Sequence, residues 1–139
     1  MKQEISILVI SPNIILYNTV LDASYAIGDS IVVYRTLNVA EALQMMKNLE
    51  LRSDKLQIYL DSKASKSEAQ RFLHVLDREY SSRSRRMVIL ADDASNTSSI
   101  VSLAIAECVG DVLNYPISSA EVDTAIQKQF PKLRTYIHS

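Results

Sequence analysis

Five short apolar runs constrain the fold of this chain more than any other feature of its sequence. They are ISILVIS at 5–11, SIVVYR at 30–35, KLQIYLD at 55–61, RMVILA at 86–91 and DVLNY at 111–115. The first four are mostly apolar without strict alternation, which is typical of strands buried on both faces. Apolar residues at helical spacing fill the stretches between them. This alternation predicts right-handed crossovers and a parallel sheet covered by helices on both faces.

Capping residues mark the ends of the expected helices. Asn13 and Asn38 are candidate N-caps, and Gly28 and Gly110 are candidate stop residues of the first and fourth helices. A third helix is expected over 65–80. The residues expected to face the core are Ile15, Leu16, Thr19, Val20, Ala23 and Ile27 in the first helix and Val39, Leu43, Met46 and Leu49 in the second.

These elements predict a flavodoxin-like α/β fold: five βα units, a doubly wound five-stranded parallel sheet and a three-layer sandwich. The last helix is expected to follow a serine cap in SSAEVDTAIQKQF and to end before Pro131. The 139 residues are the size of one domain. We therefore expect a domain over 1–130 and a C-terminal tail over 131–139.

Composition argues against several classes of function. The net charge is −1, with 15 basic and 16 acidic residues, so the chain has no overall attraction to nucleic acid or to an anionic membrane. The basic stretch SSRSRR at 81–86 is interpreted as a solvated loop. Only two glycines are present and none forms a glycine-rich loop after the first strand, which argues against a nucleotide-phosphate cradle.

The cysteine count, the histidines and the lack of long apolar segments indicate an intracellular globular protein. A single cysteine, Cys108, excludes an internal disulfide and a cysteine metal cluster. No segment resembles a secretory signal or reaches the apolar length of a membrane span, so we expect a cytoplasmic location. His74 and His138 have no nucleophile pattern near them and are interpreted as surface residues.

Four motifs resemble the receiver domains of response regulators, the bacterial two-component signalling proteins. ILVISPN resembles the first strand of that family, after which an acidic pair normally follows. IYLD resembles the third strand, which ends in the phosphoacceptor aspartate, and MVILAD resembles the fourth. CVGDVLNYPIS resembles the stretch in which a lysine precedes a proline. The resemblance covers essentially the whole chain and implies that Asp61 is at the phosphoacceptor position.

The other positions of the family's pocket are changed. Ser11 and Pro12, followed by Asn13, stand where the acidic pair would hold Mg²⁺. Ala91 replaces the switch serine or threonine, and Tyr115 replaces the lysine. Phosphoryl transfer to an aspartate depends on a divalent cation and on a positive side chain that hold the phosphoryl charge. We therefore expect a pseudo-receiver that is not an enzyme, has no cofactor and does not bind Mg²⁺.

Two alternatives remain open. Asp92 and Asp93, which follow the fourth strand, could join Asp61 as metal ligands while Lys63 supplies a cation, which would make the domain a phosphoacceptor receiver with a rearranged site. Alternatively, the chain is the N-terminal targeting module of a larger protein such as a pilus-assembly ATPase.

As a pseudo-receiver, the chain is expected to bind other proteins. By resemblance, its partners would be a sensor kinase, an output domain or an ATPase, and the binding face would include the fourth helix, the fifth strand and the fifth helix, at about 96–129. The exposed polar positions expected on this face, bordered by Tyr115, are Ser118, Ser119, Glu121, Asp123, Gln127 and Lys128. Homodimerisation through the same face is a further expectation.

Overall fold

A computed structural model describes residues 5–28, 30–49, 55–61, 71–72, 74–76, 78, 88–92 and 109–131. Its strands are β1 (Ile5–Ile10), β2 (Ile31–Thr36), β3 (Leu56–Asp61), β4 (Val88–Asp92) and β5 (Val109–Asn114). Its helices are α1 (Ile14–Ile27), α2 (Val39–Asn48) and α5 (Ser119–Gln129). Residues 71–72, 74–76 and 78 are also helical, and His74 is exposed, as expected.

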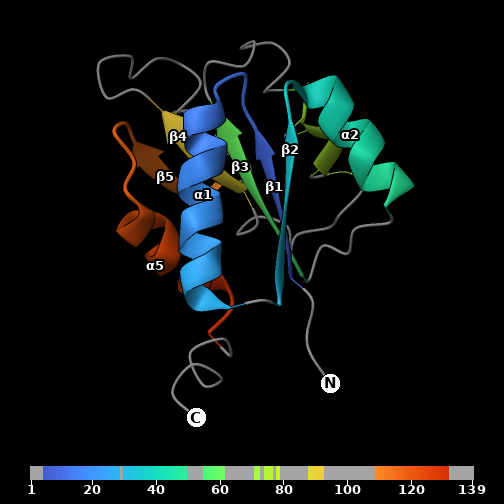
Figure 1. Ribbon diagram of the computed structural model, residues 1–139. Coiled ribbons are helices and arrows are strands. Elements are labelled where there is room, and N and C mark those ends of the chain that lie inside the picture. The colour runs from blue at the N-terminus through green and yellow to red at the C-terminus, as the bar shows by residue number, and fades with distance from the viewer. Residues whose placement is uncertain are drawn as a thin grey trace.

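The five strands form one parallel sheet in the order β2-β1-β3-β4-β5. This is the flavodoxin-like order, so the predicted fold class is confirmed. Helices α1 and α5 pack on one face of the sheet and α2 packs on the other, which gives the three predicted layers (Figure 1).

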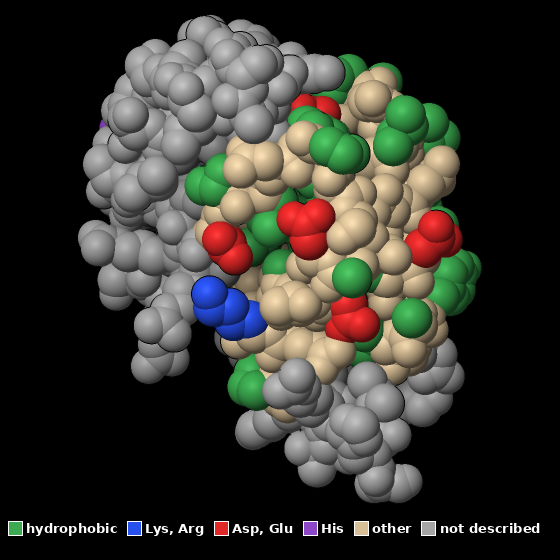
Figure 2. All heavy atoms as spheres, turned by 90° about the vertical axis from the view of Figure 1, so that its left-hand side faces the viewer, with side chains coloured by type: hydrophobic (Ala, Val, Ile, Leu, Met, Phe, Trp, Pro, Cys, Tyr) green, Lys and Arg blue, Asp and Glu red, His purple; other side chains and the backbone are tan. Residues whose placement is uncertain are grey.

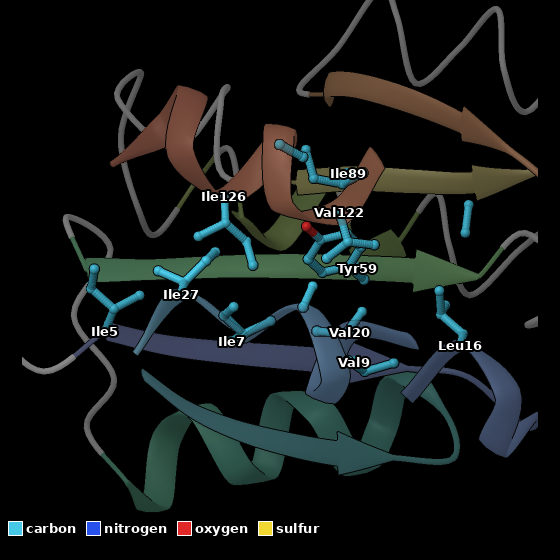
Figure 3. Packing of buried hydrophobic residues seen from close by; sticks show 13 residues of the cluster. Ile5, Ile7, Val9, Leu16, Val20, Ile27, Tyr59, Ile89, Val122 and Ile126 are labelled. Atoms are coloured by element: carbon cyan, nitrogen blue, oxygen red, sulfur yellow. The ribbon is translucent and has the colours of Figure 1, made fainter. Parts of the chain in front are cut away.

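The central strand β3 divides the core in two, because successive side chains of a strand point to opposite faces. All six of its residues are buried, as expected for a strand covered on both sides. Leu56, Ile58 and Leu60 belong to the apolar cluster beneath α2. Tyr59 belongs to the cluster beneath α1 and α5, where Figure 3 shows it together with Val20 and Val122.

Three of the helices begin at the predicted kind of residue. The side chains of Asn13 and Asn38 accept hydrogen bonds from the backbone N–H groups of Ile15 and Glu41. Ser118 and Glu121 form a reciprocal capping box at the start of α5. These local bonds set the starting points of α1, α2 and α5, and the sequence predicts all three.

The prediction that Gly110 ends a helix is wrong. Gly110 lies within β5, where Val109 pairs with Val88 and Asp111 pairs with Ile89. Gly110 is therefore the extra residue of an irregularity in the β4–β5 register, a position at which glycine is common within strands. Backbone pairing with β4 extends the strand two residues before the predicted start.

Two of the expected core residues are exposed. Ile15 is 63% exposed and Leu49 is 45% exposed. Ile15 lies in the first turn of α1, while the inward side of that helix is formed by Leu16, Val20, Ala23, Ser24 and Ile27. Leu49 is the C-cap of α2, where the helix has already ended.

Several predictions concern residues outside the described ranges. These include most of the expected helix at 65–80, residues 96–108 of the expected binding face, and the individual residues Lys63, Asp93, Cys108 and His138. Within the described part of the chain, none of the helices combines the length and the apolar character needed to cross a bilayer.

Candidate functional site

The candidate site lies at the carboxyl edge of the sheet, where three chain segments converge. Asp61 is the last residue of β3, Ser11 directly follows β1, and Tyr115 directly follows β5. Ile10 pairs with Leu60, so the next residues of these two parallel strands, Ser11 and Asp61, are adjacent. Ligand sites of open parallel sheets form at this edge.

Asp61 is fully buried and its carboxylate is held by two hydroxyl groups. The Oγ atom of Ser11 donates to Asp61 Oδ2 at 2.6 Å, and the Oη atom of Tyr115 donates to the same oxygen at 3.0 Å. A buried carboxylate is costly unless it is hydrogen-bonded. The two hydroxyls therefore offset part of the cost of burying Asp61.

Ser11 also organises the turn that leads into α1. The backbone N–H of Asn13 donates to Ser11 Oγ at 3.0 Å, and the carbonyl oxygen of Asn13 lies 3.1 Å from the same hydroxyl. A serine hydroxyl has one proton, and its shorter contact is with Asp61. Ser11 thus couples the carboxylate of β3 to the start of α1.

Tyr115 is half-buried and follows the strand with a cis peptide bond to Pro116. Burial raises the pKa of the Tyr115 phenol, and the negative charge of Asp61 and the hydrogen bond to it raise this pKa further. The phenol therefore stays protonated at neutral pH and acts as a neutral donor. It supplies a hydrogen bond to Asp61 but no positive charge.

Ala91 lies on the strand between the two strands whose ends this hydrogen bond joins. Strand β4 lies between β3 and β5, Ala91 pairs with Asp61, and Ala91 is buried in the cluster beneath α1 and α5. Tyr115 packs against the same cluster. The bond from Tyr115 to Asp61 therefore spans a strand whose side chain at this point is only a methyl group.

The structure brings together four of the predicted pocket residues and separates two. Ser11, Asp61, Ala91 and Tyr115 lie on the same side of the sheet. The Asn13 side chain instead caps α1, and Pro12 is exposed. The observed pocket is thus formed by four of the six residues that the sequence predicts for it.

At this edge, the carboxylate that the network of Ser11 and Tyr115 would present to a Mg²⁺ ion is that of Asp61. Magnesium prefers one or two carboxylates together with water and phosphate oxygens. Asp61 Oδ2 already accepts two hydrogen bonds, and Pro12 has no side-chain ligand atom. Among the described residues, no three His, Cys, Asp or Glu side chains are grouped so that they could hold a metal ion.

The predicted polar positions of α5 are only partly free surface. Ser118, Ser119, Glu121 and Lys128 are exposed, but Ser118 and Glu121 bond to each other in the capping box. Asp123 and Gln127 were expected to be exposed; instead they are partly buried and hydrogen-bonded to each other, because they lie one turn apart on the flank of α5. Figure 2 shows mainly acidic charges among the described residues of this side of the molecule.

A pair of glutamines that the sequence analysis missed holds α5 against β3. Gln57 is fully buried, and its Nε2 atom donates to the Ala125 carbonyl at 3.1 Å and to Gln129 Oε1 at 2.9 Å. Gln129 Nε2 donates in return to the Leu56 carbonyl at 2.9 Å. The feature of the sequence that could have indicated this contact is Gln57 itself, a polar residue within the apolar run KLQIYLD.

Comparison with solved structures gives the class of fold. The chemotaxis response regulator CheY4 of Vibrio cholerae has 16% identity and a TM-score of 0.68, with 91% of this chain and 98% of that chain covered. A response regulator from Thermotoga maritima has 12% identity and a TM-score of 0.71, with coverage of 92% and 98%. The chain therefore has the fold of response-regulator receiver domains.

A third similar structure belongs to a protein that is not described as a response regulator. It is a pilus assembly-related protein from Burkholderia pseudomallei, with 22% identity, a TM-score of 0.64 and coverage of 95% of this chain and 93% of that chain. No protein-family model and no curated protein matches the sequence. At these identities the likeness concerns the fold.

Proposed function

We propose that this chain is a receiver-fold signalling module that acts by binding another protein, and that Asp61 is a structural acceptor rather than a phosphoacceptor. The observation that carries the proposal is the pair of hydrogen bonds from Ser11 and Tyr115 to Asp61 Oδ2. This arrangement uses the carboxylate to join the ends of β1, β3 and β5.

The chemistry of phosphoryl transfer supports this proposal. An attacking aspartate needs a free oxygen in line with the phosphorus atom, and the developing charge needs a cation. Asp61 is fully buried, and one of its oxygens already has two donors. Tyr115, in the position where the family has lysine, is a neutral phenol. We accordingly propose that the domain has no self-phosphotransfer activity and does not use Mg²⁺.

The fold supports a protein partner. One of the similar solved structures is described as a two-component response regulator/GGDEF domain protein, and the likeness covers 52% of that chain. A receiver fold in that protein thus accompanies an output domain. For this chain we propose a partner of the same general kind, an output domain or a sensor kinase. The likeness to the pilus assembly-related protein shows the shared fold and does not favour a role in pilus assembly.

The decisive experiment compares the natural chain with a variant in which the acidic pair and the lysine of the family's pocket are restored. Both are treated with Mg²⁺ and either acetyl phosphate or beryllofluoride, and the products are followed by intact mass and by amide NMR. The restored variant is Ser11→Asp/Pro12→Asp/Tyr115→Lys, and thermal unfolding checks that it folds. Asp61→Ala in the natural background is the matched negative control.

We expect no added phosphate mass and no saturable shift near Asp61 in the natural chain. The restored variant tests whether the fold still supports the reaction when cation ligands and a lysine are present. Phosphate on Asp61 of the natural chain, absent from the Asp61→Ala variant, would contradict the proposal and favour the alternative with a rearranged metal site.

A further inference from the structure

Two tyrosine and aspartate pairs span β4 on the side of the sheet that α1 and α5 cover. Tyr115, which follows β5, and Asp61 of β3 form the edge pair, and a hydrogen bond of 3.0 Å joins them. Tyr59 of β3 and Asp111 of β5 form the inner pair, in which the tyrosine and the aspartate have exchanged strands. Both members of the inner pair are register partners of Ile89, the residue of β4 between them. Register partners of adjacent strands point to the same face, so the inner pair shares one side of the sheet.

The hydroxyl of the inner pair is buried without an acceptor. Tyr59 is fully buried, and its Oη atom has no hydrogen-bond partner in the described part of the chain. Figure 3 shows this oxygen directed toward α5, where the labelled residues are the apolar Val122 and Ile126. An unpartnered buried hydroxyl destabilises the conformation that contains it. A conformation that supplies an acceptor to Tyr59 removes this penalty.

An extra residue in β5 turns Asp111 toward the side of the sheet on which α1 and α5 lie. Val88 of β4, which is buried beneath α2, pairs with Val109, whereas Ile89 pairs with Asp111, so Gly110 is the extra residue. Successive strand residues alternate between the two faces. An unbroken pairing from Val88 onward would therefore have turned Asp111 to the α2 side. Irregularities of this kind re-aim a side chain, and here the side chain is the only carboxylate of β5.

The two residues of the inner pair are close enough to meet. Neighbouring strands lie about 4.8 Å apart, so the inner pair is separated by about 9.5 Å across β4. The edge pair crosses the same two strand spacings and forms its bond, with Ala91 on the strand between. Burial raises the pKa of Tyr59, and the charge of Asp111 raises it further, which places the carboxylate within electrostatic range of the phenol. For the inner pair, the residue on the strand between is Ile89, a larger side chain that is buried in the same cluster as Tyr59.

We propose that this chain has a second, less populated conformation in which Tyr59 donates a hydrogen bond to Asp111, and that Ile89 keeps the two residues apart in the main conformation. To form this bond, Ile89 turns aside and the Asp111 side chain, which accepts from the Val112 N–H at 2.8 Å in the main conformation, turns inward. This movement gives the strand that leads into α5 two states without a phosphoryl group. It does not use Asp61, so its failure would leave the proposed role of Asp61 intact.

Ile89→Ala tests the role of the intervening side chain, because it gives the inner pair the small residue that the edge pair already has. The readout is a double-mutant cycle of Tyr59→Phe and Asp111→Ala by urea unfolding. In the Ile89→Ala background, the interaction between the two changes should alter the unfolding equilibrium constant at least about tenfold, as for a hydrogen bond to a charged group. In the natural background, the factor should be below about twofold.

Two further backgrounds make this cycle specific. Ile7→Ala is the matched control, because Ile7 is a buried isoleucine of the same cluster that lies on β1, away from β5. Its factor should stay below about twofold. Ile89→Val removes less volume than Ile89→Ala and serves if the alanine variant does not fold. Its factor should be at least about threefold.

Relaxation-dispersion NMR detects the second conformation in the natural chain. We expect exchange on the microsecond-to-millisecond timescale at the backbone amides of residues 110–112. Tyr59→Phe should abolish this exchange, and Tyr25→Phe, at an exposed position, should leave it unchanged. Three results would overturn the proposal: no exchange at these amides, exchange that persists after Tyr59→Phe, or a cycle factor at Ile89→Ala and Ile89→Val no larger than at Ile7→Ala.

Discussion

Tyr115 and Asp61 are joined by a hydrogen bond of 3.0 Å that links the end of β5 to the end of β3 across the intervening strand. Ser11 donates to the same carboxylate oxygen from the end of β1. A change at one of these three residues therefore affects the other two. We therefore expect the stability of the sheet's carboxyl edge to depend on this small network.

Tyr115 and Tyr59 should respond differently to removal of their hydroxyl groups. Tyr115→Phe removes a hydrogen bond to a buried carboxylate and should lower the free energy of unfolding by about 1–3 kcal/mol. Tyr59→Phe should leave it unchanged or raise it, because the buried Tyr59 hydroxyl has no hydrogen-bond partner in the described part of the chain. Urea unfolding measures both. Tyr25→Phe, at an exposed position, is the control, and equal losses for Tyr115→Phe and Tyr59→Phe would contradict the assignment.

Ser11 and Tyr115 should be energetically coupled. Because both donate to Asp61 Oδ2, the remaining donor partly compensates for the loss of the other. The Ser11→Ala/Tyr115→Phe variant should therefore lose more stability than the sum of the single variants, by at least about 0.5 kcal/mol. A double-mutant cycle by urea unfolding provides this value. Strict additivity would mean that the two hydroxyls do not share the carboxylate.

Stability should decline in alkali. Burial raises the pKa of Tyr59, with a smaller contribution from the charge of Asp111, and burial and Asp61 raise the pKa of Tyr115. The folded state therefore keeps these protons at pH values at which the unfolded chain, with an ordinary tyrosine pKa of 10.0, releases them. This stabilisation is complete below about pH 10 and is lost as the pH rises further.

Urea midpoints at pH 8 and pH 11 measure this dependence. Tyr59→Phe and Tyr115→Phe should each reduce the difference between the two midpoints, because each removes one proton that folding retains. Tyr25→Phe should not change it. If the two buried-site variants kept the full alkaline loss, other groups would be responsible for it.

The glutamine pair should control the C-terminal half of α5. Gln129→Ala removes the hydrogen bond that Gln57 Nε2 donates to Gln129 and the hydrogen bond that Gln129 donates to the Leu56 carbonyl. This loss should lower the free energy of unfolding by about 1–2 kcal/mol. Amide hydrogen exchange in the last turn of α5 should become faster. Gln44→Ala, which removes an exposed bond to Asn48 on α2, is the matched control and should have little effect. Unchanged exchange in α5 after Gln129→Ala would show that apolar packing alone holds the helix.

The local signals of the sequence predicted the elements well. The runs at 5–11 and 55–61 are strands, and Asn13, Asn38 and Ser118 cap helices, because these signals act over a few neighbouring residues. Gly110 was placed wrongly because its conformation depends on pairing with β4, which no local pattern encodes. Gln57 was not recognised as a contact to α5, because its partners Ala125 and Gln129 lie 68 and 72 residues away.

The sequence by itself determined the order of the strands and helices, the parallel sheet, and the presence of serine, aspartate, alanine and tyrosine at the positions of a receiver pocket. The elements and the sheet follow from residue type and periodicity along the chain, whereas the pocket positions follow from the resemblance to receiver domains. Only the tertiary structure decided what the pocket residues do. The distance from Tyr115 to Asp61 depends on the packing of β3, β4 and β5, and this packing directs both Ser11 and Tyr115 at one buried oxygen.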